Sequence, residues 1–305
     1  MGTTYNVKFL PTEQQPVNDM QREIDSILDA VNMSMSTYLP ESELSRINAT
    51  ARGVPIQLSD DLAIVLAQAL EISWYTDGAY DMTAGPLVNL WGFGPDKHPG
   101  TIPELSIIQR TLRLTGPDQV ILTMGPFTLT KLQDNVYLDL SGIAKGYAVD
   151  QLAAWLEARG ITHYLVEIGG EIKASGTNAK GLAWRIGIEQ PVTDVRLVQR
   201  IIGLDNLAMA TSGDYRNYFE QDGKRYSHVI NPKTGYPVSH NLVSVTVLDR
   251  STTWADAMAT ALLVMGPEAG PRFANQQQIQ AMFILRNNDN YRELYSSGFE
   301  ANLVE

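Results

Sequence analysis

The chain of 305 residues contains no cysteine, which excludes disulfide bonds, cysteine nucleophiles, thiolate zinc sites and iron–sulfur clusters. It also lacks any run of about 18 apolar residues, so we expect no membrane-spanning segment. Positive charge is scarce, because 23 Lys and Arg face 34 Asp and Glu for a net charge of −11. Such a protein repels nucleic acid and anionic lipid, and an anionic ligand would need a local metal ion or helix N-terminus.

The composition is that of a globular protein, with 44% hydrophobic and 19% charged residues. Apolar periodicity predicts helices over residues 19–35, 60–74, 144–159 and 254–265, and another that begins near Pro103. Strand-like runs occupy residues 119–123, 127–132, 135–140, 163–168, 171–175, 183–189, 198–204, 225–230, 242–248, 281–286 and 291–296. Helices and strands neither alternate strictly nor separate fully, which indicates an α+β fold with mostly antiparallel mixed sheets and packed helices. We expect one domain over residues 1–305, with a lobe junction near 92–103.

The first candidate for chemistry is the turn DLSGIAKG at residues 139–146, which precedes a predicted helix. Unpaired N–H groups at such a helix N-terminus can bind phosphate. Lys145 would add positive charge there, and Asp139 could accept a hydrogen bond from a ligand. The alternative interpretation is structural, with Ser141 as a helix cap and Lys145 in solvent.

Asp256 and Thr260 form the second candidate, because residues four apart on a helix share one face. A carboxylate and a hydroxyl are hard oxygen donors, which suit Mg²⁺ better than zinc or copper. In the structural alternative, Asp256 only favours the helix N-terminus, with Thr252 or Thr253 as the cap, and Thr260 bonds back to its own helix.

The third candidate is His228, one of four histidines, which ends a strand just before an Asn-Pro turn. An imidazole close to a loop suits a general base that acts on a hydroxyl near neutral pH, although a purely structural histidine is the alternative. Glycines and aromatic residues also gather in residues 75–94. They could contact a flat heteroaromatic ligand or simply pack together.

Seven motifs, in one order along the chain, resemble those of the ApbE-like family of FAD:protein FMN transferases. They are MSTY (35–38), DGAYDMTAGPLVNLWGFGP (77–95), DLSGIAKGYAVD (139–150), VEIGGEI (166–172), ATSGDYRNY (210–218), SHVINPKTG (227–235) and ADAMATALLVMG (255–266). The resemblance implies a two-lobed α+β enzyme that cleaves the FAD pyrophosphate, attaches FMN to a threonine of an acceptor protein and releases AMP.

The resemblance also implies the residues of the site. Mg²⁺ would be bound by the side chains of Asp256 and Thr260 and by the backbone carbonyl of Gly142, and His228 would activate the threonine. FAD contacts would fall at Met1, Tyr38, Ala79, Tyr80, Asp81, Asp139, Lys145 and Ile230. The family further implies a periplasmic or cell-envelope protein, often a lipoprotein with a leader ahead of the sequence given, whose acceptor is a subunit of a membrane redox complex.

Two other functions use the same residues. With water in place of threonine, the protein would be a Mg²⁺-dependent FAD pyrophosphatase that releases FMN and AMP. Without catalysis, it would be an FAD-binding protein. A pure binder has no use for a base beside the phosphates, so the candidate set as a whole favours an enzyme.

Overall fold

The structure is a computed structural model that describes residues 2–11, 19–95, 101–192, 197–288 and 290–304. It divides into two compact units, and both combine helices with antiparallel strands, which confirms the expected α+β class. Unit 1 comprises Met1–Ala30, Ile143–Tyr215 and Asn241–Glu305, and unit 2 comprises Val31–Gly142 and Arg216–His240. The expected lobe junction at 92–103 falls within unit 2, with residues 96–100 outside the described part. The single-domain expectation stays a prediction.

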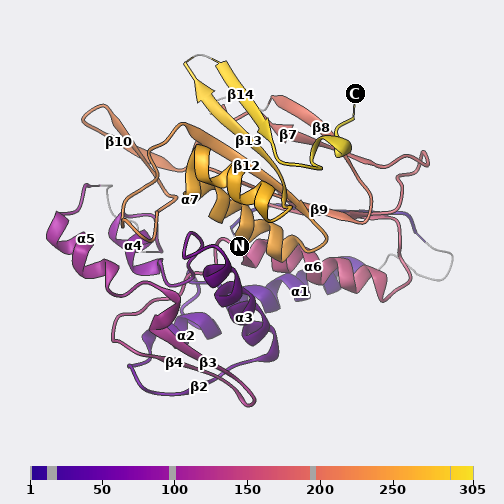
Figure 1. The fold of residues 1–305 in the computed structure, drawn as a ribbon. Helices are drawn as coiled ribbons and strands as arrows, with labels where there is room; N and C mark the ends of the chain where they lie inside the picture. Colours follow the sequence, from indigo (N-terminus) through magenta and orange to yellow (C-terminus); the bar gives the residue numbers. More distant parts are fainter. Residues whose placement is uncertain (1, 12–18, 96–100, 193–196, 289, 305) are drawn as a thin grey trace. The chain divides into compact units, whose positions relative to one another are not determined.

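Unit 1 is built on a seven-stranded sheet with the order β1-β5-β6-β9-β12-β13-β14, antiparallel at every pairing (Figure 1). Its strands are β1 (Tyr5–Phe9), β5 (Tyr164–Ile168), β6 (Glu171–Ser175), β9 (Leu207–Gly213), β12 (Leu242–Asp249), β13 (Gln280–Asn287) and β14 (Asn290–Tyr295). A hairpin of β7 (Trp184–Glu189) and β8 (Val198–Leu204) and a 3₁₀ turn (Glu300–Asn302) complete its strands and turns. The sequence did not predict β1 or β9, and β9 is a central strand of the sheet.

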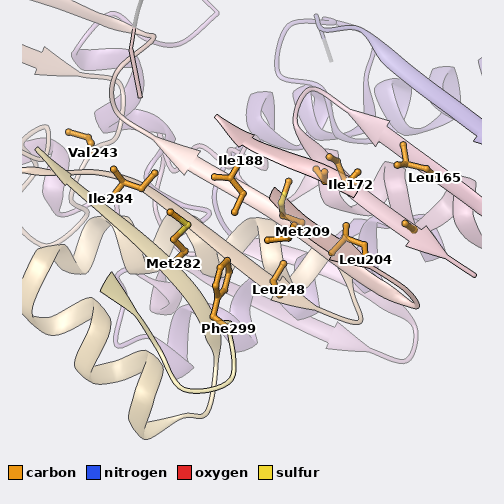
Figure 2. Close-up of a cluster of buried hydrophobic side chains, with 13 residues drawn as sticks. Leu165, Ile172, Ile188, Leu204, Met209, Val243, Leu248, Met282, Ile284 and Phe299 are labelled. Carbon is orange, nitrogen blue, oxygen red and sulfur yellow. The ribbon is translucent and has the colours of Figure 1, made fainter. Parts of the chain in front are cut away.

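Side chains alternate between the two faces of this sheet, as strand geometry requires. On one face, Ile172 of β6 and Met209 of β9 pack with Ile188 and Leu204 of the β7–β8 hairpin in a buried apolar cluster (Figure 2). Glu171 and Lys173, the neighbours of Ile172 along β6, therefore point to the opposite face. That face is the one on which the helices of unit 1 pack, as the bond from Lys173 to α6 shows.

Two helices pack together against this second face, α6 (Ala144–Glu157) and α7 (Thr252–Gln276). Gly160 follows α6 with a φ of 73°, which agrees with its predicted role as a stop signal. α7 is longer than expected and is interrupted by non-helical backbone at Gly266. The two helices approach each other closely at Gly146, where a Cβ atom would lie only 2.3 Å from the carbonyl oxygen of Thr252.

Unit 2 contains four helices, a small sheet of order β2-β4-β3 and the hairpin β10–β11 among the residues described. The bounds are α2 (Glu43–Ala49), α3 (Asp60–Tyr75), α4 (Gly85–Leu90), α5 (Leu105–Leu112), β2 (Ile56–Gln57), β3 (Val120–Met124), β4 (Phe127–Lys131), β10 (Tyr218–Gln221) and β11 (Lys224–Ser227), with a 3₁₀ turn at Pro117–Gln119. α1 (Met20–Met35) includes residues of both units. Ser59 caps α3 by accepting from Leu62 N, as predicted.

The strand expected over residues 135–140 is wrong, because Asn135 lies in a turn with a φ of 66° and residues 136–140 pair with no strand. The side chain of Asn48 takes the place of a neighbouring strand. Its amide nitrogen donates to the carbonyl oxygen of Leu138 at 2.9 Å, and its oxygen accepts from Leu138 N at 2.7 Å. The backbone N–H of Asp139 donates to Met82 O, so the apolar pattern is satisfied by burial without a sheet.

We predict that Gly146→Ala lowers the free energy of unfolding by about 1–3 kcal/mol, the usual range for overpacking. The new methyl group would collide with backbone atoms of Thr252 and Thr253, which cannot rotate away. Urea unfolding measures the change. Gly203→Ala in β8 is the matched control, because its methyl would meet its nearest neighbour, Val304, at an ordinary 3.4 Å. An equal loss in both variants would contradict the close packing of α6 on α7.

Candidate active site

The expected site residues divide between the two units. Unit 1 holds Lys145, Asp256 and Thr260. Unit 2 holds Tyr38, Ala79, Tyr80, Asp81, Asp139, Gly142, His228 and Ile230. Met1, the remaining expected FAD contact, lies outside the described residues. Their roles as ligands of FAD or of a metal stay predictions, and the geometry within each unit shows what each group can do.

In unit 1, the buried carboxylate of Asp256 lies at the N-terminus of α6. Its Oδ2 accepts a hydrogen bond from Gly146 N at 3.0 Å, and its Oδ1 lies 3.5 Å from Lys145 Nζ. Ile143 at the start of α6 makes no side-chain cap bond, so Asp256 satisfies an N–H that a cap would normally take. The alternative in which Ser141 caps this helix is therefore wrong. The positive end of the α6 dipole instead faces a carboxylate from α7.

Asp256 does not serve its own helix as a cap. Ser251 caps α7, with its hydroxyl accepting from Trp254 N at 3.2 Å, so neither Thr252 nor Thr253 is the N-cap. The Thr260 hydroxyl does not bond back to its own helix within the described part of the chain, and it pairs instead with the hydroxyl of Ser212 on β9 at 3.0 Å. Thr260 thus contacts β9 of the sheet, whereas Asp256 contacts the start of α6.

Glu171 of β6 is a second buried carboxylate beside this pair, and the sequence did not single it out. Its Oε1 lies 3.0 Å from Lys145 Nζ, so one ammonium group serves two carboxylates. Burial alone would lower the pKa of Lys145, but the charges of Asp256 and Glu171 raise it above its ordinary value. The Oε2 atom of Glu171 is buried and finds no hydrogen-bond partner among the described residues. Strand alternation, which places Glu171 opposite Ile172, is the signal that could have found it.

The residues of unit 1 fit a divalent cation. If both carboxylates were ionised, they and one ammonium would carry a net charge of −1 in a buried place, which is costly, so without a cation Glu171 holds a proton near neutral pH. Asp256 and Thr260 supply hard oxygen donors of the kind that Mg²⁺ prefers. No three His, Cys, Asp or Glu side chains form a metal-binding group in the described ranges. The expected Mg²⁺ ligands include only one side chain of these four types, Asp256, so a group of three is not required for the expected site.

In unit 2, His228 follows β11 and is held by one backbone carbonyl. The oxygen of Asn217 accepts from His228 N at 3.0 Å and lies 3.1 Å from the ring nitrogen Nδ1. A carbonyl can only accept, so Nδ1 carries the proton and, in the neutral ring, Nε2 does not. The ring of Phe93 lies edge-on to the imidazole, with 6.3 Å between the two ring centroids. His228 therefore has the tautomer that a general base acting through Nε2 needs.

The segments that contain Ala79 and Ile230 are joined within unit 2. Lys233 Nζ donates to Asp77 Oδ2 at 2.5 Å, which links the loop after α3 to the turn after β11. Tyr80 and Ile230 are buried. The aromatic residues of this region pack on one another, and Trp91 is fully buried, stacks on Tyr226 and donates through Nε1 to Gly235 O at 2.8 Å. For Trp91, the packing interpretation of the aromatic cluster is the correct one.

The two acidic residues expected at FAD differ in how their carboxylates are used. Asp81 Oδ1 accepts from Thr83, and its Oδ2 accepts from Gly116 N at 2.8 Å. Burial raises the pKa of Asp81, and these hydrogen bonds partly oppose it. Both oxygens of this carboxylate are thus engaged in hydrogen bonds that hold the backbone near Thr83 and Gly116. Asp139 uses Oδ1 to accept from Ser141 N. Partial burial, and after it the charge of Asp139, raises the pKa of Tyr38, so these two expected FAD contacts lie near each other.

The buried Glu171 predicts a dependence of stability on pH in metal-free buffer with EDTA. Burial, which outweighs the opposing charge of Lys145, raises the pKa of Glu171 to about 8. The folded state then holds a proton that the unfolded chain has lost, so the free energy of unfolding should fall as pH rises from 4.5 to about 8. Glu171→Gln should flatten this slope in urea unfolding, whereas Glu220→Gln at an exposed position should not. Equal slopes in both variants would refute the assignment.

Comparison with known proteins extends these observations. The model of the ApbE family matches residues 1–283. A Vibrio cholerae protein described as an FAD:protein FMN transferase is 47% identical over 304 residues, which cover 98% of this chain and 90% of that protein.

Solved structures agree with this match. The flavin transferase ApbE from Vibrio cholerae has a TM-score of 0.91 at 44% identity and covers 99% of this chain and 96% of its own. The ApbE protein from Thermotoga maritima has a TM-score of 0.88 at 28% identity, covering 100% and 97%. The likeness extends through both units, including the segments that hold the carboxylate pair and the imidazole. The chain belongs to the ApbE family.

Proposed function

We propose that this chain is a Mg²⁺-dependent FAD:protein FMN transferase. It would cleave the pyrophosphate of FAD, attach FMN through a phosphoester to a threonine of an acceptor protein, and release AMP. The observation that carries the proposal is the buried Asp256 carboxylate at the N-terminus of α6, in a chain that matches a transferase of this description over 98% of its length. The net negative charge of the chain makes such a local site necessary for an anionic substrate.

Asp256 and Thr260, with the backbone carbonyl of Gly142, would hold the Mg²⁺ ion. When bound, the ion neutralises charge on the phosphoryl oxygens and on the departing AMP. Asp256 accepts from Gly146 N, and the earlier N–H groups at the start of α6, where Ile143 provides no side-chain cap, would bind the phosphates. Lys145 adds a cation there, and its position is set by Asp256 and Glu171.

His228 would act as the general base. Its Nε2 takes the proton of the threonine hydroxyl as the threonine oxygen bonds to the phosphorus of the FMN half. The bond from that phosphorus to the bridging oxygen breaks, and AMP leaves with the electron pair. Asn217 O keeps the ring proton on Nδ1, so the accepting nitrogen is the other one. The chain's contribution is to position the nucleophile and to accept one proton.

The acceptor and the compartment rest on the family resemblance. We propose a threonine in a subunit of a membrane redox complex as the acceptor, and the periplasm or cell envelope as the location. Among the described residues, no helix is both long and apolar enough to cross a bilayer. Nucleic acid is not a proposed partner, because a net charge of −11 repels it.

Mass spectrometry tests the transfer directly. A synthetic peptide with one candidate threonine, incubated with the protein, FAD and Mg²⁺, should gain the mass of an FMN moiety and release AMP. EDTA should abolish the gain, as should Asp256→Ala, because both remove the ion. The same peptide with valine in place of threonine is the control. FMN and AMP without a modified peptide would favour the pyrophosphatase, and intact FAD would favour a binding protein.

We predict that His228→Ala retains FAD binding but loses about 10²–10⁴-fold in the rate of transfer, the usual cost of losing a general base. Single-turnover transfer and fluorescence titration of FAD measure the two quantities separately. His163→Ala is the control, since that imidazole bonds to Thr177 in unit 1 and has no proposed role. Wild-type transfer by His228→Ala would remove the base from the mechanism.

A further inference from the structure

Asp150, in the middle of α6, binds the start of α7 with its carboxylate. Oδ1 accepts from Thr252 N at 3.1 Å and from the Thr252 hydroxyl at 3.0 Å. Oδ2 accepts from Thr253 N at 2.9 Å, from the Thr253 hydroxyl at 2.7 Å and from the Ser251 hydroxyl at 3.1 Å. One carboxylate thus accepts hydrogen bonds from three consecutive residues, the cap Ser251 and the first two residues of α7.

The charge of this carboxylate is compensated from two directions. The first N–H groups of α7 have no partner within their own helix and carry the positive end of its dipole, so a carboxylate is favoured there. Lys173 on β6 lies 3.0 Å from Oδ1. Burial alone would raise the pKa of Asp150, but Lys173 and the bonds from Thr253 hold it below its ordinary value. Asp150 is therefore an ionised acceptor.

The residues that Asp150 holds begin the stripe of α7 that contains the expected metal ligands. Thr252, Asp256 and Thr260 are four residues apart and lie on one face of the helix. Between the two helices, Gly146 lets the backbone of α6 approach Thr252, and its N–H bonds to Asp256. Asp150 and Gly146 are themselves four apart, one turn of α6. The bonds from Asp150 to Thr252 and from Gly146 to Asp256 therefore set both the distance between α6 and α7 and the position of α7 along α6.

We propose that Asp150 is a positioning residue for the cation site. It fixes the Thr252 end of the stripe, and thereby the rotation of α7 that presents Asp256 and Thr260 on one face of the helix. The inference rests on the proposed function, because it assumes that these two residues bind Mg²⁺. Neither Asp150 nor its hydrogen bonds touch the ion or FAD in this role.

Asp150→Asn tests the role, because the amide keeps the shape but replaces one acceptor oxygen with a donor. The dissociation constant for Mg²⁺, measured by isothermal titration calorimetry with ADP present as an unreactive pyrophosphate, should rise about 10–100-fold, as for other outer partners of metal ligands. The kcat for FMN transfer should return toward the wild-type value at high Mg²⁺. The KM for FAD, measured at saturating Mg²⁺, should stay unchanged.

Two further variants keep the test decisive. Thr252→Val removes one donor to Asp150 and should raise the Mg²⁺ dissociation constant in the same direction, even if Asp150→Asn does not fold. Ser59→Ala removes the cap of α3 in unit 2 and should lower the melting temperature without changing Mg²⁺ affinity.

The outcomes separate the two proposals. If wild type binds Mg²⁺ and transfers FMN while both variants bind Mg²⁺ as tightly, the positioning role is wrong and the function stands. If Ser59→Ala weakens Mg²⁺ binding equally, the effect is one of general stability and the inference also fails. If wild type neither binds Mg²⁺ nor modifies the peptide, the proposed function fails instead.

Discussion

The contact on which unit 1 depends most is the burial of a carboxylate against the end of a neighbouring helix. Asp256 has almost no exposed surface, so its charge needs compensation from the protein. Gly146 N and Lys145 provide it, and Lys145 is shared with Glu171, whose pKa burial raises to about 8. Two ionised carboxylates beside one ammonium would be costly to bury, so Glu171 holds a proton near neutral pH. The close approach at Gly146 follows from the same requirement, because any side chain there would separate the carboxylate from its donor.

In unit 2, side-chain contacts hold the loops in place. Four of its expected FAD contacts, Ala79, Tyr80, Asp81 and Ile230, lie after α3 and after β11, outside the named helices and strands. The stacked Trp91 and Tyr226, the Trp91 bond to Gly235 O and the Asp81 bonds to Thr83 and Gly116 provide the rigidity instead. Functional groups on loops held by a packed scaffold are a common arrangement, because loops tolerate the irregular backbone that a ligand requires.

Local signals in the sequence predicted the elements that local forces determine. Ser59 caps α3 and Gly160 ends the α6 region as their residue types indicated. β9 was missed because LAMATSG has a single β-branched residue, Thr211, and its strand character comes from neighbours β6 and β12. Residues 135–140 have a strand-like pattern, but the Asn48 side chain replaces the ladder.

The candidate site follows the same division. The i, i+4 spacing of Asp256 and Thr260 can be recognised in the sequence. The role of Glu171 depends on its contact with Lys145, which also contacts Asp256, and these two residues are 111 positions apart in the chain. No local pattern contains such a distance. The family resemblance named residues in both units, and the packing within each unit then showed which of their atoms are already engaged, such as both oxygens of Asp81.

The carbonyl of Asn217 has an evolutionary consequence. Many catalytic histidines are oriented by a carboxylate or hydroxyl side chain, which a single nucleotide change can remove. Here the partner is a main-chain oxygen that also accepts the N–H of His228, and every residue type at position 217 would supply it. The backbone at the hairpin β10–β11 thus determines the ring tautomer, and a substitution of the Asn217 side chain does not change it. Substitutions around this histidine can therefore change the neighbouring side chains while the protonation pattern of the imidazole persists.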